Sequence, residues 1–301
     1  MMRLPEPNRP FEHDPFDHVV WPGTYWFKRA LRVGLYTLLV LLAGLFLLPL
    51  LWMIMTSLKP IDQVMTSPPV WVPREWQWEN YEHATNAIPF WTYTWNTVKV
   101  CVLNVIGALL STSLVAYGFA CLKWPGRDKV FVASLVTLMI PFPVLMVPLF
   151  SIYLKLGWIG TLKPLWVPAF FGTATNIFLL RQYLLTIPQD LGDAARIDGA
   201  GEFRIFWQIV LPLARPALMI VGLFAFLAAW NDFIGPLIFL TDKSLYTLAL
   251  GLQDFHAGMG GAPYNLLMAA GTLIVLPVFV LFFIFQGSFL RGVSLQGFSR
   301  R

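Results

Sequence analysis

The sequence predicts an all-α, polytopic membrane protein with six transmembrane helices. Of its 301 residues, 57% are hydrophobic and only 12% are charged, whereas soluble domains carry about 25% charged residues. Its mean hydropathy is +0.65. The apolar runs are also of the right length, because a helix needs about 20 residues to cross about 30 Å of hydrocarbon. They are too long to be the alternating strands of a membrane barrel.

The first predicted span covers residues 33–55 and is uncharged. A polar and aromatic stretch of 32 residues precedes it, and its apolar run is too long for a signal peptide, so we expect it to remain as an anchor. Rings and cations of the kind found just before this span lie at the level of lipid headgroups, which predicts an interfacial helix within residues 1–32. These residues are Trp21, Tyr25, Trp26, Phe27, Lys28, Arg29 and Arg32.

Five further spans are predicted from the remaining apolar runs. They cover residues 96–121, 130–154, 163–185, 217–240 and 266–286. Prolines interrupt several of them, and a proline inside a helix breaks or kinks it. We therefore expect irregular backbone in the third span at Pro141, Pro143 and Pro148, in the fourth at Pro164 and Pro168, in the fifth at Pro236 and in the sixth at Pro277. Broken helices are typical of transporters.

The basic residues predict the orientation of the spans. With the N-terminus placed in the cytoplasm, 15 of the 21 lysines and arginines fall on the cytoplasmic side, as the positive-inside rule requires. We therefore expect both termini to be cytoplasmic. The net charge of +5 then reports topology, and the chain lacks the basic, aromatic-interleaved soluble domain of a nucleic-acid binder.

Motifs of common enzymes are missing from the chain. It has no GxxxxGK[ST] phosphate-binding loop, no GxSxG and no HExxH, so neither ATP hydrolysis by that route nor these hydrolytic chemistries are predicted. The four histidines show no metal-ligand spacing, and no metal site is predicted. Cys101 and Cys121 lie about 30 Å apart on one predicted helix and cannot bridge each other.

One segment differs from the rest of the chain. Residues 193–216 form a charged, glycine-punctuated interruption between apolar spans, placed in the cytoplasm by the predicted topology. Its apolar spacing predicts two short amphipathic helices that meet at residues 199–201, with a turn back into the membrane at Leu211 and Pro212. Large aromatic side chains beside small ones are typical of an interface with a partner.

A second candidate site lies in the fifth predicted span. Trp230, Asn231 and Asp232 are followed four residues later by Pro236. An ionisable group within a span indicates a cavity or a polar contact. Two interpretations stay open: an outer gate or pathway role, and a structural contact in which Asp232 caps a neighbouring helix.

The spacing D-A-A-x3-G-x9-I-x-L-P in this chain resembles the EAA loop of permease subunits in binding-protein-dependent ABC importers. It is formed by Asp193, Ala194, Ala195, Gly199, Ile209, Leu211 and Pro212. The family's Glu is here Asp193, which is one methylene shorter. In that family the loop forms a coupling helix that docks in a groove of the ATPase subunit. The resemblance therefore implies ATPase-coupling roles for Asp193, Ala194, Ala195, Asp198, Gly199, Ala200, Phe203, Phe206, Ile209, Leu211 and Pro212.

The likeness covers most of the chain from about residue 30. It includes Thr56-Ser57-Leu58-Lys59, Ala116-Tyr117, Leu180-Arg181-Gln182-Tyr183 and Trp230-Asn231-Asp232-Phe233, and is to the smaller permease of maltose-type sugar importers. It implies a type I ABC importer permease fold in the bacterial inner membrane. It also implies a second homologous permease, two ATPase subunits that hold ATP and Mg, a solute-binding protein and a carbohydrate substrate, with no cofactor bound by this chain.

The predicted topology and this resemblance together divide the chain into three parts. We expect residues 1–32 to be a cytoplasmic N-terminal segment, residues 33–287 to be the permease domain with its coupling loop at 186–216, and residues 288–301 to be a cytoplasmic tail. The tail either contacts the ATPase dimer or is a frayed basic terminus. On the outer side, a glycine-rich loop over residues 241–265 is similar to one that enters the binding protein's cleft in maltose-type systems. The likeness implies contacts by Asp254, Phe255, His256, Gly258, Gly260 and Tyr264.

Two other classes of function make different demands on the sequence. A secondary transporter driven by an ion gradient needs carboxylates near the bilayer midplane and preferably an inverted repeat. Only Asp232 approaches the first requirement. A membrane enzyme or a structural scaffold is the other class, and the missing catalytic motifs disfavour the enzyme. A transport subunit that depends on a separate ATPase is the function that the sequence favours.

Overall fold

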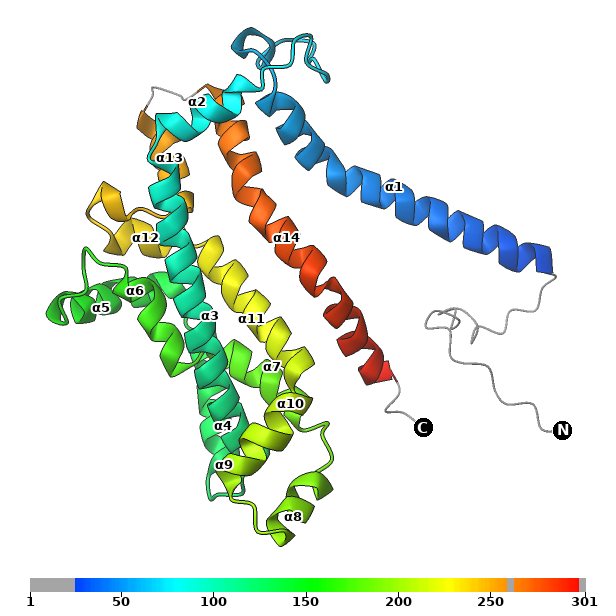
Figure 1. The fold of residues 1–301 in the computed structure, drawn as a ribbon, viewed down its shortest axis with the longest axis vertical. Helices are drawn as coiled ribbons and strands as arrows, with labels where there is room; N and C mark the ends of the chain where they lie inside the picture. The colour runs from blue at the N-terminus through cyan, green and yellow to red at the C-terminus, as the bar shows by residue number, and fades with distance from the viewer. Residues whose placement is uncertain (1–24, 259–262, 298–301) are drawn as a thin grey trace. The chain divides into compact units, whose positions relative to one another are not determined.

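A computed structural model describes residues 25–258 and 263–297, in which all regular structure is helical, so the predicted all-α class is confirmed. The chain divides into two compact units, residues 1–52 and 53–301. The helices are α1 (Tyr25–Ser57), α2 (Glu79–Ala87), α3 (Phe90–Ala120), α4 (Arg127–Val136), α5 (Phe142–Lys155), α6 (Lys163–Trp166), α7 (Ala174–Leu184), α8 (Asp190–Ile197), α9 (Glu202–Ile205), α10 (Leu211–Leu213), α11 (Arg215–Trp230), α12 (Ile234–Phe239), α13 (Leu248–Gly258) and α14 (Tyr264–Gly297) (Figure 1).

The described part of the first unit, residues 25–52, lies within one helix, α1. The helix is continuous from Tyr25 into the first predicted span, so the expected interfacial helix is not separated from that span by a break. Most of its large apolar side chains from Val33 to Leu51 are exposed. A helix that is hydrophobic on all sides suits a lipid environment. Trp21 lies outside the described residues.

Three described helices are long and apolar enough to cross a membrane: Arg29–Ser57, Phe90–Ala120 and Tyr264–Gln286. Two bent pairs bring the number to five if each pair is one span. One pair joins Arg127–Met139 to Phe142–Lys155 with a bend of 101°. The other pair joins Glu202–Leu213 to Arg215–Trp230 with a bend of 79°.

The fourth predicted span, residues 163–185, is not a continuous helix. It consists of α6, a 3-10 turn over Val167–Phe171, and α7. Gly172 lies between the 3-10 turn and α7, and its φ of 80° is a left-handed value that favours glycine. The number of six spans therefore remains a prediction.

The prolines act differently from one another. The third predicted span does break at Pro141, after which α5 begins at Phe142. Pro143 lies in the first turn of α5, where the missing amide costs no helical hydrogen bond. Pro148 and Pro277 lie inside the continuous helices α5 and α14. The breaks predicted at these two positions are wrong, because one lost hydrogen bond does not end a helix whose other turns are intact.

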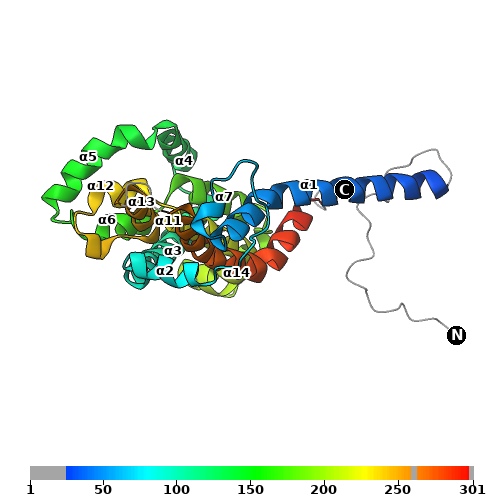
Figure 2. The same cartoon turned by 90° about the horizontal axis from the view of Figure 1, so that it is seen from above.

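Helix α3 is central to the second unit and packs against α11, α7, α13 and α6 (Figure 1). Small residues along α3, such as Gly107, Ala108 and Ser111, let the neighbouring backbones approach closely. The Ser111 hydroxyl donates to the carbonyl of Ala169 at 2.7 Å. In contrast, α4 and the start of α5 arch away from the core (Figure 2). The one buried residue of α5 is Tyr153, whose ring meets that of Phe239 in α12 at 5.1 Å.

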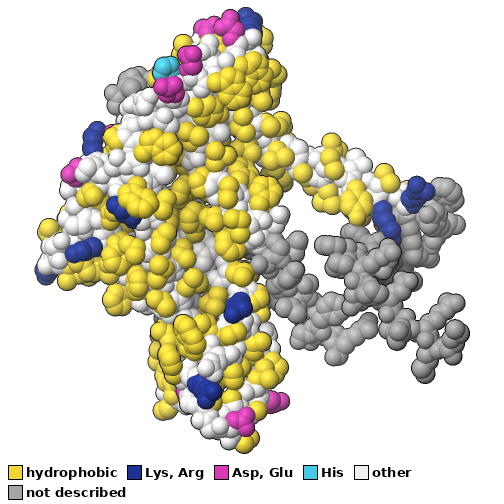
Figure 3. Space-filling model, in the orientation of Figure 1, with side chains coloured by type: hydrophobic (Ala, Val, Ile, Leu, Met, Phe, Trp, Pro, Cys, Tyr) yellow, Lys and Arg dark blue, Asp and Glu magenta, His cyan; other side chains and the backbone are white. Residues whose placement is uncertain are grey.

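The two ends of the second unit are polar, as expected where spans leave a membrane. Figure 3 shows acidic side chains over α2 at one end and near α8 at the other, with mostly hydrophobic side chains on the face between them. At the α2 end, the buried Asn80 amide donates to the carbonyls of Ser57 and Lys59 at 2.9 and 3.0 Å. Asn265 at the start of α14 donates to the same Lys59 carbonyl at 3.2 Å. This buried network joins α2 to the start of α14.

Gly251 in α13 permits its close contact with α3. A Cβ atom at this position would overlap the ring of Tyr93, which is 2% exposed and cannot easily move away. Gly251→Ala is therefore expected to cost about 1–3 kcal/mol, as overpacking of a core does. Thermal unfolding of the purified chain in detergent should show a lower Tm.

Gly118→Ala on α3 is the matched control, because nothing lies within 4 Å of the added methyl group. Both substitutions improve helix propensity by the same amount, so the comparison isolates the steric effect. An equal or higher Tm for Gly251→Ala than for Gly118→Ala would contradict this packing.

Candidate functional site

The segment between α7 and α11 contains the two short helices that the sequence predicts, α8 and α9. A π-helical turn over Phe206–Val210 and then α10 follow α9. The chain bends at Ala214 and enters α11, two residues after the predicted turn at Pro212. The segment thus leaves α7, forms a helical hairpin and returns to the apolar part of the unit.

Gly199 makes the turn between α8 and α9. Its φ is 82°, a left-handed conformation that favours glycine. The Gly199 amide donates to the carbonyl of Arg196 at 3.0 Å, and the Ala200 amide donates to the carbonyl of Ala195 at 2.9 Å. These bonds satisfy carbonyls that the end of a helix would otherwise leave unpaired. The glycine of the sequence motif therefore has a definite backbone role.

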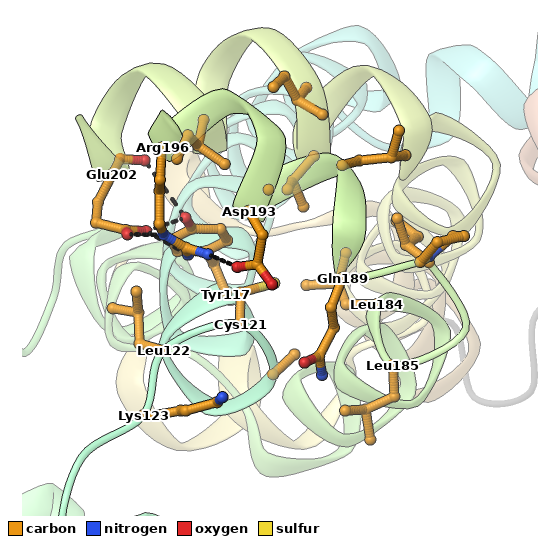
Figure 4. A pocket seen from close by; sticks show the side chains of 18 of the residues that line it. Tyr117, Cys121, Leu122, Lys123, Leu184, Leu185, Gln189, Asp193, Arg196 and Glu202 are labelled. Atoms are coloured by element: carbon orange, nitrogen blue, oxygen red, sulfur yellow. Dashed lines mark hydrogen bonds and ion pairs between the residues drawn. The ribbon is translucent and has the colours of Figure 1, made fainter. Parts of the chain in front are cut away.

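A cluster of charged and polar side chains, here named the clasp, closes this hairpin (Figure 4). The clasp consists of Asp193, Arg196, Glu202 and Tyr117. The guanidinium of Arg196 donates to Asp193 Oδ1 at 2.6 Å within α8. It also donates to Glu202 Oε1 at 2.7 Å and Oε2 at 3.2 Å across the glycine turn. The hydrogen bond to Glu202 is the main reason that the pKa of Arg196 is raised above its ordinary value.

Tyr117 attaches the hairpin to α3. Its hydroxyl donates to Glu202 Oε2 at 2.6 Å, and its ring meets the ring of Phe206 edge to face at 5.2 Å. Tyr117 is 6% exposed. A hydrogen bond to a carboxylate is roughly twice as strong as one between neutral groups. The clasp therefore joins α8, α9 and α3.

The inward face of the hairpin is buried. Ile205, Phe206 and Val210 are at most 7% exposed and pack with side chains of α3, α7 and α11 in one cluster. Phe206 was among the residues expected to couple to a partner, but its ring is 5% exposed and lies in this cluster. In this structure Phe206 anchors the hairpin to the rest of the unit.

The outward face presents apolar side chains. Ile197 at the end of α8 is 87% exposed, and Phe203 is 74% exposed. The rings of Phe203 and Trp207 stack at 6.5 Å. Large, rigid and exposed apolar groups of this kind are typical of a surface that binds another protein.

The other predicted coupling residues lie around these two faces. Asp193 and Asp198 are exposed, and Asp193 is held by Arg196. Ala194 is exposed, whereas Ala195 and Ala200 are half-buried and pack against the cluster behind them. The remaining members, Ile209, Leu211 and Pro212, are half-buried.

A cavity of about 480 Å³ opens beside the clasp (Figure 4). It is bounded by the last residues of α3, by residues 184–189 and by α8. Lys123, Gln189 and the clasp residues supply its polar lining. The described residues contain no group of three or more His, Cys, Asp or Glu side chains that could hold a metal ion.

The candidate residues near the end of α11 make structural contacts. The indole of Trp230 donates to the carbonyl of Ile274 in α14 at 3.2 Å and stacks on Phe226. Asp232 Oδ1 accepts from the amide of Gly235 at 3.0 Å. Asn231 and Asp232 lie between α11 and α12, because α11 ends ten residues before the predicted end of this span. Pro236 is buried in α12.

The candidate residues of the glycine-rich loop are divided between described and undescribed parts. Asp254 forms an ion pair with Lys243 at 2.8 Å, and Phe255 is 3% exposed, so its side chain is not offered to a partner in this conformation. The rings of His256 and Tyr264 meet at 5.9 Å. Gly258 ends α13, and Gly260 lies outside the described residues.

Sequence reasoning missed the clasp. The pair of Asp193 and Arg196 has a spacing of three residues, at which helical side chains meet, and this signal was available. The contact between Tyr117 and Glu202 joins residues 85 positions apart. Nothing in the sequence pattern indicates that contact.

These features define a class of protein: a membrane component built of apolar helices, with a helical hairpin that exposes large apolar side chains at one end. The chain belongs to the family described as "Binding-protein-dependent transport system inner membrane component", whose sequence profile matches residues 112–295. It is therefore a permease-type subunit of the inner membrane.

Named relatives are similar over most of this chain. A permease of an arabinooligosaccharide transport system from Halalkalibacterium halodurans is 34% identical over 85% of this chain and 92% of its own. A diacetylchitobiose uptake permease from Streptomyces coelicolor is 32% identical over 86% of each chain. An sn-glycerol-3-phosphate transport permease from Yersinia pestis is 30% identical over 88% of this chain and 97% of its own.

A solved structure of an ABC transporter for alginate import has a similar fold. The TM-score is 0.77 at 22% identity, over 89% of this chain and 99% of that chain. A second structure, of the alginate transporter with a pentasaccharide-bound periplasmic protein, gives a TM-score of 0.63 at 14% identity, over 87% of this chain and 95% of that chain. These likenesses establish the permease fold.

Because Arg196 is the central cation of the clasp, the local stability of the hairpin should depend on it. Arg196→Gln removes the charge that holds Asp193 and Glu202, so α8 should open more often. An exposed ion-pair network of this size is worth about 1 kcal/mol, which corresponds to roughly five-fold faster opening. Hydrogen exchange of the amides of residues 190–201 should rise by that factor.

Arg204→Gln is the control, because Arg204 lies in the same hairpin and its side chain donates to Gln208 Oε1, at 2.9 Å, and not to Asp193 or Glu202. It should leave exchange in residues 190–201 unchanged. Equal effects of the two substitutions would mean that Arg196 does not hold the hairpin.

Proposed function

We propose that this chain is the translocation subunit of an ATP-driven carbohydrate importer, and that α8 is the helix through which a separate ATPase subunit acts on it. The observation that carries the proposal is the construction of the hairpin. Its outward face exposes Ile197 and Phe203, while its inward face is anchored to α3 by Tyr117 and Phe206. A surface that is exposed on one side and firmly attached on the other can transmit a displacement.

Family membership supports the ATP-driven part of the proposal. Members of this family work in binding-protein-dependent systems, and the chain itself carries no phosphate-binding loop. Energy must therefore come from a partner. Moving the equilibrium between the inward-facing and outward-facing states from 1:99 to 99:1 requires about 5.5 kcal/mol of differential binding. Nucleotide-driven association of two ATPase subunits can supply this free energy.

The substrate class rests on the relatives. The permeases described above are named for arabinooligosaccharides, diacetylchitobiose and sn-glycerol-3-phosphate. Two of the three named substrates are short oligosaccharides, so we propose an oligosaccharide or a related sugar as the substrate. A solute-binding protein would deliver it, and a second homologous permease would complete the pathway.

The membrane orientation is part of the same proposal. With α8 in the cytoplasm, both chain termini are cytoplasmic, and α2 with residues 243–258 faces the delivering protein. The structure favours an ion-gradient-driven importer less, because Asp232 is the one carboxylate within the predicted spans that could couple an ion. Its Oδ1 already accepts a hydrogen bond from the amide of Gly235, three residues further on.

Affinity purification tests the proposed partner. The tagged full-length chain is purified from membranes of its own host, and the ATP hydrolysis of the purified material is measured. We expect a separate nucleotide-binding subunit to co-purify with the wild type and with Gly201→Pro. Gly199→Pro should lose at least 90% of the co-purified ATPase, because proline cannot adopt a φ of 82° and lacks the amide that donates to Arg196.

Gly201→Pro is the matched control, because Gly201 has a φ of −71°, which proline also adopts. Recovery of each variant in membranes by tag detection separates failed docking from failed insertion. Absence of any ATPase from the wild-type preparation, or full ATPase recovery with Gly199→Pro, would contradict the proposed function.

A further inference from the structure

We propose that α3 is the element that links α8 to the segment of residues 243–258 at its opposite end, with Tyr117, Asn96 and Thr97 as the positioning residues. This inference rests on the proposed function, because it concerns how a displacement of α8 is passed on. It assigns a role to three polar side chains of α3 that form hydrogen bonds with other segments of the chain.

The contact at one end of α3 is the attachment of Tyr117 to the hairpin. The Tyr117 hydroxyl donates to the Glu202 carboxylate at 2.6 Å, and Glu202 is bound in turn by Arg196 of α8. The ring of Tyr117 packs on Phe206, which follows α9. A displacement of α8 that keeps these contacts must therefore displace this end of α3.

The contact at the other end of α3 involves two adjacent buried polar residues. The amide of Asn96 donates to the carbonyls of Ser244 and Tyr246 at 2.9 and 3.1 Å. The hydroxyl of Thr97 accepts from the amide of Leu248 at 2.8 Å. Asn96 is 5% exposed and Thr97 is 1% exposed. Buried polar groups of this kind are costly to leave unpaired, so the three bonds are maintained together.

Residues 243–258, which these bonds attach to α3, are also held together by bonds within the segment. Asp242 accepts from the amide of Ser244 at 2.8 Å, and Lys243 pairs with Asp254 of α13 at 2.8 Å. Gly251 of α13 lies against the ring of Tyr93, one turn before Thr97 on α3. Residues 243–258 can therefore follow α3 as one piece.

Helix α3 itself is suited to carry a displacement between these contacts. It extends without interruption over Phe90–Ala120 and contains no proline, unlike the bent pairs of helices beside it. The 20 residues between Thr97 and Tyr117 span about 30 Å. An unbroken helix with polar attachments at both ends moves more nearly as a rigid body than a broken one.

The alternative is that the two ends respond independently, through α11 and α14. These helices also pack against one another and against α3 or α13. If that alternative holds, the polar attachments of α3 contribute only local stability. An experiment must therefore read the far end of α3 while the near end is perturbed.

Hydrogen exchange of the purified complex provides this test. The tagged full-length chain, with its co-purified ATPase subunit, is measured with and without the ATP analogue AMP-PNP. In the wild type we expect nucleotide to change the exchange of both residues 190–205 and residues 243–258. In Tyr117→Phe and in Thr97→Val, the nucleotide-dependent change in exchange of residues 243–258 should fall at least three-fold. The change in exchange of residues 190–205 should remain as in the wild type.

The double variant identifies a shared path. If both residues act through α3, Tyr117→Phe combined with Thr97→Val should reduce the response of residues 243–258 no further than the stronger single variant. Both substitutions are nearly isosteric, and either one alone is sufficient for the test. Tyr153→Phe is the control, because Tyr153 is also buried, at 7% exposed, and belongs to α5. In this variant, the exchange of residues 243–258 should respond to nucleotide as it does in the wild type.

Two results would overturn the inference. One is a wild-type complex in which residues 190–205 respond to nucleotide and residues 243–258 do not. The other is a full response of residues 243–258 in either Tyr117→Phe or Thr97→Val. If residues 190–205 of the wild type do not respond, or if no ATPase co-purifies, then the proposed function fails, and the inference fails with it.

Discussion

The second unit of this chain depends on the close packing of one uninterrupted helix, α3, with the helices around it. In a membrane the hydrophobic effect does not drive helices together, so close contact between backbones and hydrogen bonds between helices must do so. The small residues of α3 permit that contact, and its serine, threonine, asparagine and tyrosine side chains bond to other segments. Around this helix the chain can include broken helices without losing its core.

The candidate site follows from the same packing. A loop of mixed charge at the end of several spans would ordinarily be mobile. Here Ile205, Phe206 and Val210 enter the cluster formed with α3, α7 and α11, and the clasp closes the hairpin from the polar side. The result is a short helix, α8, that exposes Ile197 and is nevertheless fixed at its base. Such a helix can receive a force from a partner and pass it on.

Much of this architecture was predictable from the sequence, and the reasons are specific. The uniform apolar runs of α1, α3 and α14 are signals of spans, and the glycine at position 199 marked the turn between two amphipathic helices. The relation between Tyr117 and Glu202 was not predictable, because local periodicity contains no information on a contact between residues 85 positions apart. Phe206 shows a related difficulty: an aromatic residue in an amphipathic helix can face a partner or the core, and only the three-dimensional packing decides. Pro148 and Pro277 show that a proline in a long apolar helix does not by itself end it.

The central claim is that α8 and the adjoining end of α3 form one body, held by the clasp. The most direct test is the distance between two spin labels, at Ile197→Cys on α8 and Leu114→Cys on α3, in a chain whose Cys101 and Cys121 are replaced by serine. The distance is measured by pulsed electron paramagnetic resonance in the purified complex, without nucleotide and with AMP-PNP. Our account predicts the same distance distribution in both states. A shift of about one helical turn, or ~5 Å, on nucleotide binding would mean that α8 moves independently of α3 and would contradict the account.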